Sequence, residues 1–279
     1  MLIYEIIKVL VLGIVEGITE WLPISSTGHM ILIDEILRLN VSENFLKMFL
    51  VVIQLGAICA VPVLFWERLN PISHRKTRSE RTRIWSTWGK VTVGAIPASV
   101  IGLLLDDLLD RYLYNYFVVA IALIVYGVAF ICVEKSRVEG RATIYKIEDL
   151  GYFDAVKIGL FQSLSLIPGT SRSGSSILGG MLCGVSREVS AEFSFFMAIP
   201  IMLGASGLKI VKFILAGFTV DTEELLILLV GITVAFIVSL SVIRFLMEFV
   251  KRHDFTVFGY YRIGIGIIII LYFWVKQSL

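Results

Sequence analysis

The chain has 279 residues, of which 57% are hydrophobic and 17% are charged, and its formal net charge is +2. Soluble domains carry about 25% charged residues, and the mean hydropathy of this chain is +0.86. This composition excludes a soluble enzyme, a disordered chain and a nucleic-acid-binding protein. Apolar runs of about 20 residues recur, each long enough to cross a bilayer roughly 30 Å thick. We therefore predict an all-α polytopic membrane protein that is surrounded by membrane lipid.

Two apolar stretches of the chain are interrupted. The first, residues 5–39, is broken between Trp21 and His29 by a proline and a Ser-Ser-Thr-Gly run. The second, residues 154–187, is broken between Ile167 and Ser176 by Pro-Gly and a serine-rich run. The arms beside each break have roughly 11–18 residues, too few for two comfortable crossings. Because unpaired backbone cannot face lipid, we predict two re-entrant helical hairpins, each of which enters and leaves on one side.

Three uninterrupted apolar runs follow each broken stretch, and they predict six transmembrane helices, at residues 45–66, 88–106, 112–134, 192–217, 225–249 and 257–275. The hairpins carry similar patterns: Gly13-x-x-Glu16 and Pro23-x-x-Ser26, then Gly159-x-x-Gln162 and Pro168-x-x-Ser171. The offset is 146 residues for the first pattern and 145 for the second. We predict two halves, 1–134 and 154–279, joined by a cytoplasmic linker, 135–153. An odd number of crossings in each half makes this an inverted-topology repeat.

The charges in the loops predict the orientation. Lys and Arg gather in residues 67–90, in residues 135–157 and at Lys251 and Arg252. The intervening turns are acidic, with Asp106, Asp107 and Asp110 in one and Asp221, Glu223 and Glu224 in the other. Because cytoplasmic loops carry the excess of Lys and Arg, we expect the basic loops in the cytoplasm and both termini outside. The hairpins then enter from opposite sides, and their tips meet near the midplane.

Two acids, Glu16 and Glu20, lie four residues apart on the predicted helix of the first hairpin, so they share one face. An ionised carboxylate at membrane depth costs several kcal/mol unless it is paired. The pair therefore indicates either a polar cavity or a bound cation. Mg²⁺ and Ca²⁺ take oxygen ligands, and we predict that Glu16 and Glu20 hold a divalent cation, although an interfacial helix with two solvated acids would show the same spacing.

The breaks themselves hold the other reactive groups. Ser25, Ser26 and Thr27 precede His29, which can serve as a base, a proton donor or a nucleophile toward phosphorus. In the second break Arg172 stands among hydroxyls and glycines, and its planar guanidinium fits phosphate oxygens in a bidentate manner. Free backbone N–H groups at the start of the next half-helix would add donors for an anion.

Together these groups predict one site for phosphoryl transfer or hydrolysis of a lipid-linked phosphate, formed where the two tips meet. Either Ser26 attacks with His29 as base, or His29 attacks while Ser26 holds an oxygen. The first arrangement is preferred because a serine beside a base needs no unusual pKa.

The segments from Glu16 to His29 and from Pro168 to Gly174 resemble the two signature motifs of the undecaprenyl-pyrophosphate phosphatase family, which is the bacitracin-resistance protein family. The segments Gln54-Leu-Gly, Gly184-Val-Ser-Arg and Glu192-Phe-Ser-Phe also resemble it, so the resemblance covers nearly the whole chain. It implies hydrolysis of undecaprenyl pyrophosphate to the monophosphate carrier lipid used in cell-wall synthesis, with Mg²⁺ or Ca²⁺ as cofactor. It further implies a bacterial plasma membrane location, a site open to the extracytoplasmic side, and competition by bacitracin for the substrate.

By motif position the resemblance implies catalytic roles for Glu20, Ser26, His29 and Arg172, a metal site at Glu16 and Glu20, and phosphate binding by Thr27, Ser171, Arg172, Ser173 and Gly174. A transporter or flippase for lipid phosphates is the alternative, because inverted repeats with broken helices are also a transporter design. The Glu, Ser and His side chains favour hydrolysis, since a carrier would need only the arginine and the helix dipoles. The sequence leaves the oligomeric state open, a homodimer included.

Overall fold

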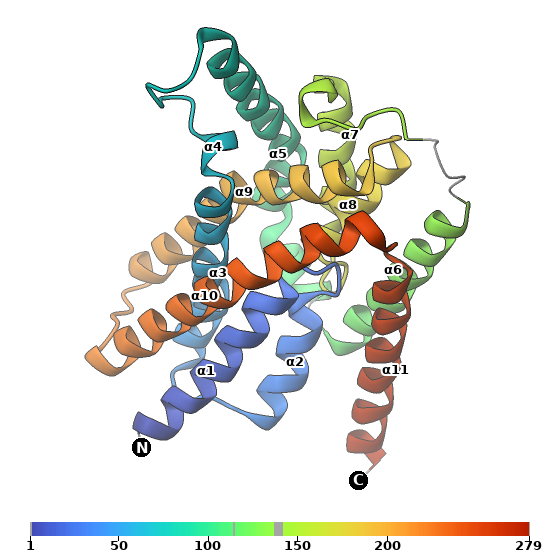
Figure 1. The fold of residues 1–279 in the computed structure, drawn as a ribbon. Helices are drawn as coiled ribbons and strands as arrows, with labels where there is room; N and C mark the ends of the chain where they lie inside the picture. The colour runs from blue at the N-terminus through green and yellow to red at the C-terminus, as the bar shows by residue number, and fades with distance from the viewer. Residues whose placement is uncertain (1, 114, 137–141, 279) are drawn as a thin grey trace.

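The computed structural model describes residues 2–113, 115–136 and 142–278, which fold into a bundle of helices (Figure 1). Within these ranges there is no β-strand, and one isolated bridge joins Ile144 to Val185. The predicted all-α class is confirmed. Arg137 and Arg141, which contribute to the predicted basic linker, lie outside the described residues, as do the side chains of Asp106, Asp107 and Asp110.

Six helices of the described chain are long and apolar enough to cross a membrane. They are α3 (Glu43–Leu64), α5 (Arg78–Leu113), α6 (Tyr116–Ser136), α9 (Arg187–Leu215), α10 (Thr222–Arg252) and α11 (Thr256–Ser278). The six predicted spans are thereby confirmed as helices. The chain is a multi-pass membrane protein by the length and composition of these helices.

Helix α5 differs most from its predicted span, 88–106, because it begins ten residues earlier, at Arg78. Residues 78–87, before that span, were predicted as loop, and that prediction is wrong. Hydropathy detects only the apolar part of a helix, whereas the backbone hydrogen bonds of α5 continue through its charged first turns. Trp88 and Lys90 fix this part of α5, since they donate to the carbonyl oxygens of Leu69 and Glu148 at 2.8 and 2.9 Å.

The interrupted stretches form two helical hairpins. The first consists of α1 (Leu2–Thr19) and α2 (Ser26–Ile36), and the second of α7 (Tyr152–Ser163), the 3₁₀ turn η2 (Leu164–Leu166) and α8 (Arg172–Leu182). In Figure 1 the first hairpin lies toward the end of the bundle that holds both termini, and α7 lies toward the opposite end. That the hairpins re-enter a membrane, and that they belong to an inverted repeat, stay predictions.

The breaks are shorter than predicted, because α2 already begins at Ser26 and α8 at Arg172. Each helix has 11 residues and follows a serine N-cap, Ser25 or Ser171. In the structure Ser171 therefore corresponds to Ser25, at the offset of 146 that also separates Glu16 from Gln162, and Ser26 corresponds to Arg172. The candidate residues of the two breaks from Ser26 to His29 and from Arg172 to Gly174 consequently occupy the first turns of helices rather than irregular chain.

Each hairpin packs against a long helix from the other half of the chain, α1 against α10 and α7 against α5. A side chain at Gly13 would meet Val234 of α10 at 3.0 Å, and one at Gly159 would collide with the carbonyl oxygen of Gly94 in α5. The missing side chains let the helices approach closely, and this cross-packing carries the tips of both hairpins into the middle of the bundle. Two short elements complete the described chain, α4 (Trp66–Leu69) and the 3₁₀ turn η1 (Ile147–Asp149).

Candidate functional site

The two breaks present helix N-termini to the centre of the bundle. Ser25 Oγ accepts a hydrogen bond from the Gly28 amide at 3.4 Å, and Ser171 Oγ accepts one from the Gly174 amide at 3.1 Å. Both caps have a φ of 72°, which is strained for a residue other than glycine, by about 1–3 kcal/mol. The first amides of a helix have no intrahelical partner, and they favour anions through the helix dipole. Each turn thus presents positive partial charge.

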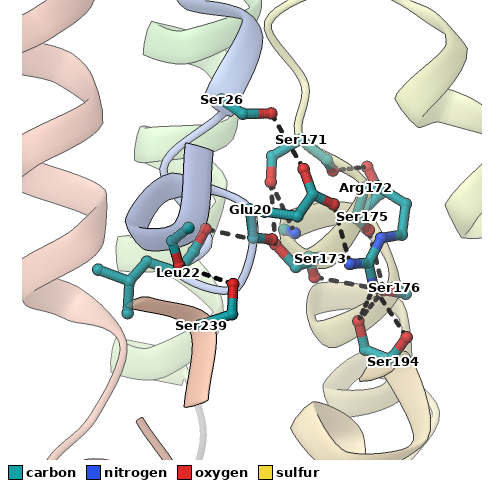
Figure 2. A network of polar contacts seen from close by, with 12 residues as sticks. Glu20, Leu22, Ser26, Ser171, Arg172, Ser173, Ser175, Ser176, Ser194 and Ser239 are labelled. Carbon is teal, nitrogen blue, oxygen red and sulfur yellow. Dashed lines mark hydrogen bonds and ion pairs between the residues drawn. The ribbon is translucent and has the colours of Figure 1, made fainter. Parts of the chain in front are cut away.

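A buried ion pair joins the two hairpins (Figure 2). Arg172 Nη2 lies 3.0 Å from Glu20 Oε1, with side chains only 11% and 6% exposed. Ser26 Oγ donates to the other carboxylate oxygen of Glu20 at 3.1 Å, and Ser173 Oγ donates to the Glu20 backbone carbonyl at 3.1 Å. One carboxylate therefore connects the hydroxyl at the start of α2 to the cation at the start of α8.

The rest of the Arg172 guanidinium is held by α9. Arg172 Nη1 donates to the Ser194 carbonyl oxygen at 2.8 Å and lies 3.3 Å from Ser194 Oγ, which itself accepts from Ser176 Oγ at 2.7 Å. The guanidinium carbon also lies 5.4 Å from the centre of the Trp21 ring. The buried Nε of Arg172 has no partner in the described part of the chain, so a donor is left for an anion.

Glu16 lies one turn before Glu20 on α1, is 1% exposed, and lies within electrostatic reach of Glu20 and Arg172. Its Oε1 atom has no hydrogen-bond partner among the residues described. Gln162, at the corresponding position of α7, is also fully buried with its amide unpartnered within the same ranges. The described residues contain no group of three or more His, Cys, Asp or Glu side chains that would hold a metal alone. A cation here would need ligands from its substrate or from water.

His29 lies in the first turn of α2, but its hydrogen bonds point away from Ser26. Its Nδ1 is 2.7 Å from the Ser25 carbonyl oxygen, and its Nε2 is 2.8 Å from the Tyr261 hydroxyl of α11. The His29 and Tyr261 rings stack at 5.6 Å with 5° between their planes. In the structure the hydroxyl of Ser26 thus donates its hydrogen bond to Glu20 and not to His29. The role of His29 as a base stays a prediction.

The structure joins most of the predicted phosphate-binding and catalytic residues by direct contacts, but it places Thr27 and His29 outside this set of contacts. The structure connects Glu20, Ser26, Ser171, Arg172 and Ser173, since Ser171 Oγ also lies 3.2 Å from Ser173 Oγ. Gly174 belongs to this group through its amide. Thr27 is half-buried beside Ser26 on α2, and His29 is turned toward α11.

Arg262 makes the most extensive contacts among the residues that the sequence did not single out. It is fully buried on α11, and its guanidinium donates to the carbonyl oxygens of Pro23 at 3.0 Å, Gly169 at 3.0 Å and Thr170 at 2.7 Å. It therefore ties both breaks to one helix. The signal was present in the sequence, because Arg262 is the one charged residue of α11 before Lys276.

Fold and site together define an integral membrane protein in which a buried Arg–Glu ion pair and a serine hydroxyl meet between two helical hairpins. The family model described as bacitracin resistance protein BacA matches residues 9–268, and the chain belongs to that family. Three relatives are each named undecaprenyl-diphosphatase. The protein from Streptococcus mutans is 55% identical over 98% of this chain and 97% of its own length. Those from Enterococcus faecalis and Streptococcus gordonii are 53% and 51% identical, over 98% and 100% of this chain and 99% of each relative.

We expect Arg262 to stabilise the folded site. Arg262→Met leaves three buried carbonyls without this donor, at about 1–3 kcal/mol for each unpaired group, so its unfolding temperature in detergent should fall clearly. Arg262→Lys, which retains a charged donor, should lose less. Arg244→Met, at an exposed position of α10, is the matched control. Unfolding of all three variants at the temperature of the unchanged protein would contradict the role of Arg262.

Proposed function

We propose that this chain hydrolyses undecaprenyl pyrophosphate to undecaprenyl phosphate and inorganic phosphate. It is thus a membrane-bound undecaprenyl-diphosphatase that recycles the carrier lipid for peptidoglycan synthesis. The contact from Arg172 through Glu20 to Ser26 is the observation that carries this function, because it unites an anion-binding group, a proton acceptor and a nucleophile. The name of its relatives supports the same activity. Bacitracin competes with the enzyme for this substrate, and a larger amount of the enzyme confers resistance to bacitracin.

Arg172 and the first turns of α2 and α8 bind the pyrophosphate. The unpartnered Nε of Arg172 and the first amides of both helices are the donors available to phosphate oxygens. Ser171 and Ser173 hold the α8 turn in place through their hydrogen bonds to Gly174 and to the first hairpin. A substrate held this way has its terminal phosphorus fixed near the Ser26 hydroxyl, and such positioning is a large part of phosphoryl-transfer catalysis.

Ser26 then attacks the terminal phosphorus. The bond from Ser26 Oγ to phosphorus forms, the bridging P–O bond breaks, and undecaprenyl phosphate leaves with the bond electrons. Glu20 takes the hydroxyl proton, because its Oε2 already accepts that hydrogen bond. Attack by His29 is the competing arrangement. It requires that His29 first leave its contacts with Ser25 and Tyr261, and for this reason we prefer Ser26.

A divalent cation fits beside this machinery. The free Oε1 of Glu16 is a buried acceptor without a partner among the residues described, whereas both oxygens of Glu20 are engaged by Arg172 and Ser26. Mg²⁺ is usually bound by one or two carboxylates together with substrate phosphates and water, which suits a site of two acids. Glu16 would hold the ion with help from Glu20, and the ion would neutralise charge on the phosphate oxygens. Mg²⁺ is therefore the cofactor that we favour over Ca²⁺.

The site faces the extracytoplasmic side. The loop before α5 carries Arg75 and Lys76, α5 itself begins at Arg78, and the positive-inside rule assigns this end to the cytoplasm. Both termini lie at the other end of the bundle (Figure 1). The first hairpin then brings Glu20 and Ser26 in from outside.

Hydrolysis by the purified protein in detergent tests the function. We expect inorganic phosphate from undecaprenyl pyrophosphate, and a fall in kcat of about 10²-fold in Arg172→Lys, because lysine keeps the charge but loses the planar fork. The KM should change less than kcat. Arg252→Lys, on an exposed side chain at the end of α10, is the matched control. A protein that moves lipid phosphates across vesicle membranes and releases no phosphate would be a flippase instead.

The metal proposal predicts different responses for the two acids. Glu16→Gln should raise the Mg²⁺ concentration for half-maximal activity by about tenfold, which corresponds to about 1.4 kcal/mol. Glu20→Gln should lose turnover even at saturating Mg²⁺, because Ser26 loses its acceptor. Glu43→Gln, at an exposed acid of α3, serves as control. Full activity of the unchanged protein in EDTA would refute the metal site.

The orientation predicts which positions react with a membrane-impermeant thiol reagent in intact cells. In a background without the three natural cysteines, Cys59, Cys132 and Cys183, we expect labelling at Leu108→Cys and none at Arg78→Cys. Both positions are exposed in the structure, so burial does not explain a difference. The reverse pattern would place the site on the cytoplasmic side.

A further inference from the structure

The guanidinium of Arg172 is held at more points than its ion pair with Glu20 requires (Figure 2). Arg172 Nη2 forms that pair at 3.0 Å. Arg172 Nη1 donates to the Ser194 carbonyl oxygen at 2.8 Å and lies 3.3 Å from Ser194 Oγ. The ring of Trp21 lies beside the same group, with its centre 5.4 Å from the guanidinium carbon. The break between α1 and α2 and the middle of α9 therefore both contact this one cation.

Trp21 and Ser194, the two additional neighbours of Arg172, are themselves fixed in place. Trp21 is fully buried, and its ring meets the ring of Phe195 on α9 edge to face, with 5.1 Å between the centres. Ser194 precedes Phe195, is also fully buried, and accepts a hydrogen bond from Ser176 Oγ of α8 at 2.7 Å. Because protein interiors are close-packed, both side chains form a rigid support for the guanidinium.

A planar group that is held in this way has a single orientation. The three nitrogens of a guanidinium lie in one plane, so contacts at Nη1 and Nη2 also fix the direction of the N–H at Nε. The Nε of Arg172 is buried and has no partner among the residues that the structure describes. A donor that already has its direction loses little freedom when an anion binds, and such positioning is worth much in catalysis.

We propose, resting on the proposed function, that Ser194 and Trp21 are positioning residues of the hydrolysis. Ser194 anchors Nη1 of Arg172 to α9, and Trp21 supports the guanidinium from the side of its ring. Glu20 alone would hold Nη2 and leave the plane free to turn about that contact. Loss of either support keeps the positive charge but releases its orientation, so turnover should fall more than substrate binding.

Hydrolysis of undecaprenyl pyrophosphate by the full-length protein in detergent tests Ser194 in a double-mutant cycle with Arg172. Ser194→Ala should lower kcat by about fivefold, with little change in KM, because the charged donor loses one acceptor. In the Arg172→Lys protein the same change should lower kcat by less than about twofold, since an ammonium has no plane to orient. Ser206→Ala, which removes another buried hydroxyl of α9, should behave as the unchanged protein.

Two substitutions test Trp21. Trp21→Phe keeps an aromatic ring and breaks no hydrogen bond within the described ranges, because the buried Nε1 of Trp21 has no partner there. Trp21→Leu removes the ring, so its kcat should fall by about fivefold and further than that of Trp21→Phe, again with little change in KM. Equal losses of kcat in the two variants would refute the part of the aromatic ring.

The other outcomes of the cycle overturn the assignment of Ser194. Equal factors for Ser194→Ala in the unchanged protein and in Arg172→Lys would mean that Ser194 acts independently of Arg172, as a merely structural residue would. A raised KM with an unchanged kcat would mean that it supports binding only. Where Trp21→Leu does not fold, this cycle alone decides. Absence of phosphate release by the unchanged protein would instead refute the proposed function, which is distinct because each result above requires an active unchanged protein.

Discussion

The buried ion pair between Glu20 and Arg172 is the constraint on which the site depends. Its partners come from hairpins in different halves of the chain, so the pair exists only when both hairpins have reached the centre of the bundle. Removal of one partner from a buried pair leaves an uncompensated charge, at about 3–5 kcal/mol. The same contact that closes the fold therefore also assembles the reacting groups, and neither hairpin holds a complete site by itself.

Equivalent positions of the two hairpins perform opposite tasks. Ser26 and Arg172 are each the first residue of an 11-residue helix, and each follows a serine cap with a φ of 72°. The caps give both positions the same surroundings of first-turn amides, where an anion is stabilised. One position carries a hydroxyl and the other a cation, so a single local geometry would provide both the proposed nucleophile and the proposed phosphate-binding group. The two turns bring both side chains to Glu20, which accepts a hydrogen bond from Ser26 and forms the ion pair with Arg172.

The sequence singled out polar residues that meet at the centre of the bundle, but it did not predict the contacts between them. Glu20, Ser26 and Arg172 are conspicuous because polar groups are rare in an apolar chain, and the six spans follow from hydropathy alone. Ser194, Tyr261 and Arg262 went unassigned because their roles arise from packing between helices distant in sequence, which no local pattern encodes. The first turns of α2 and α8 were predicted as irregular chain, since glycine and serine disfavour helix interiors although they suit a capped N-terminus.

The unpaired atoms beside the ion pair indicate what form of substrate the site accepts. Other buried polar groups here are paired, as Arg262 is with the carbonyls of Pro23 in the first half and of Gly169 and Thr170 in the second. Arg172 Nε and Glu16 Oε1 are buried charged-group atoms that lack a partner in the described ranges, one a donor and one an acceptor. A bare anion would satisfy the first and repel the second. A pyrophosphate that carries its own divalent cation would satisfy both, so the proposed cation and the proposed substrate are expected to bind this polar interior together.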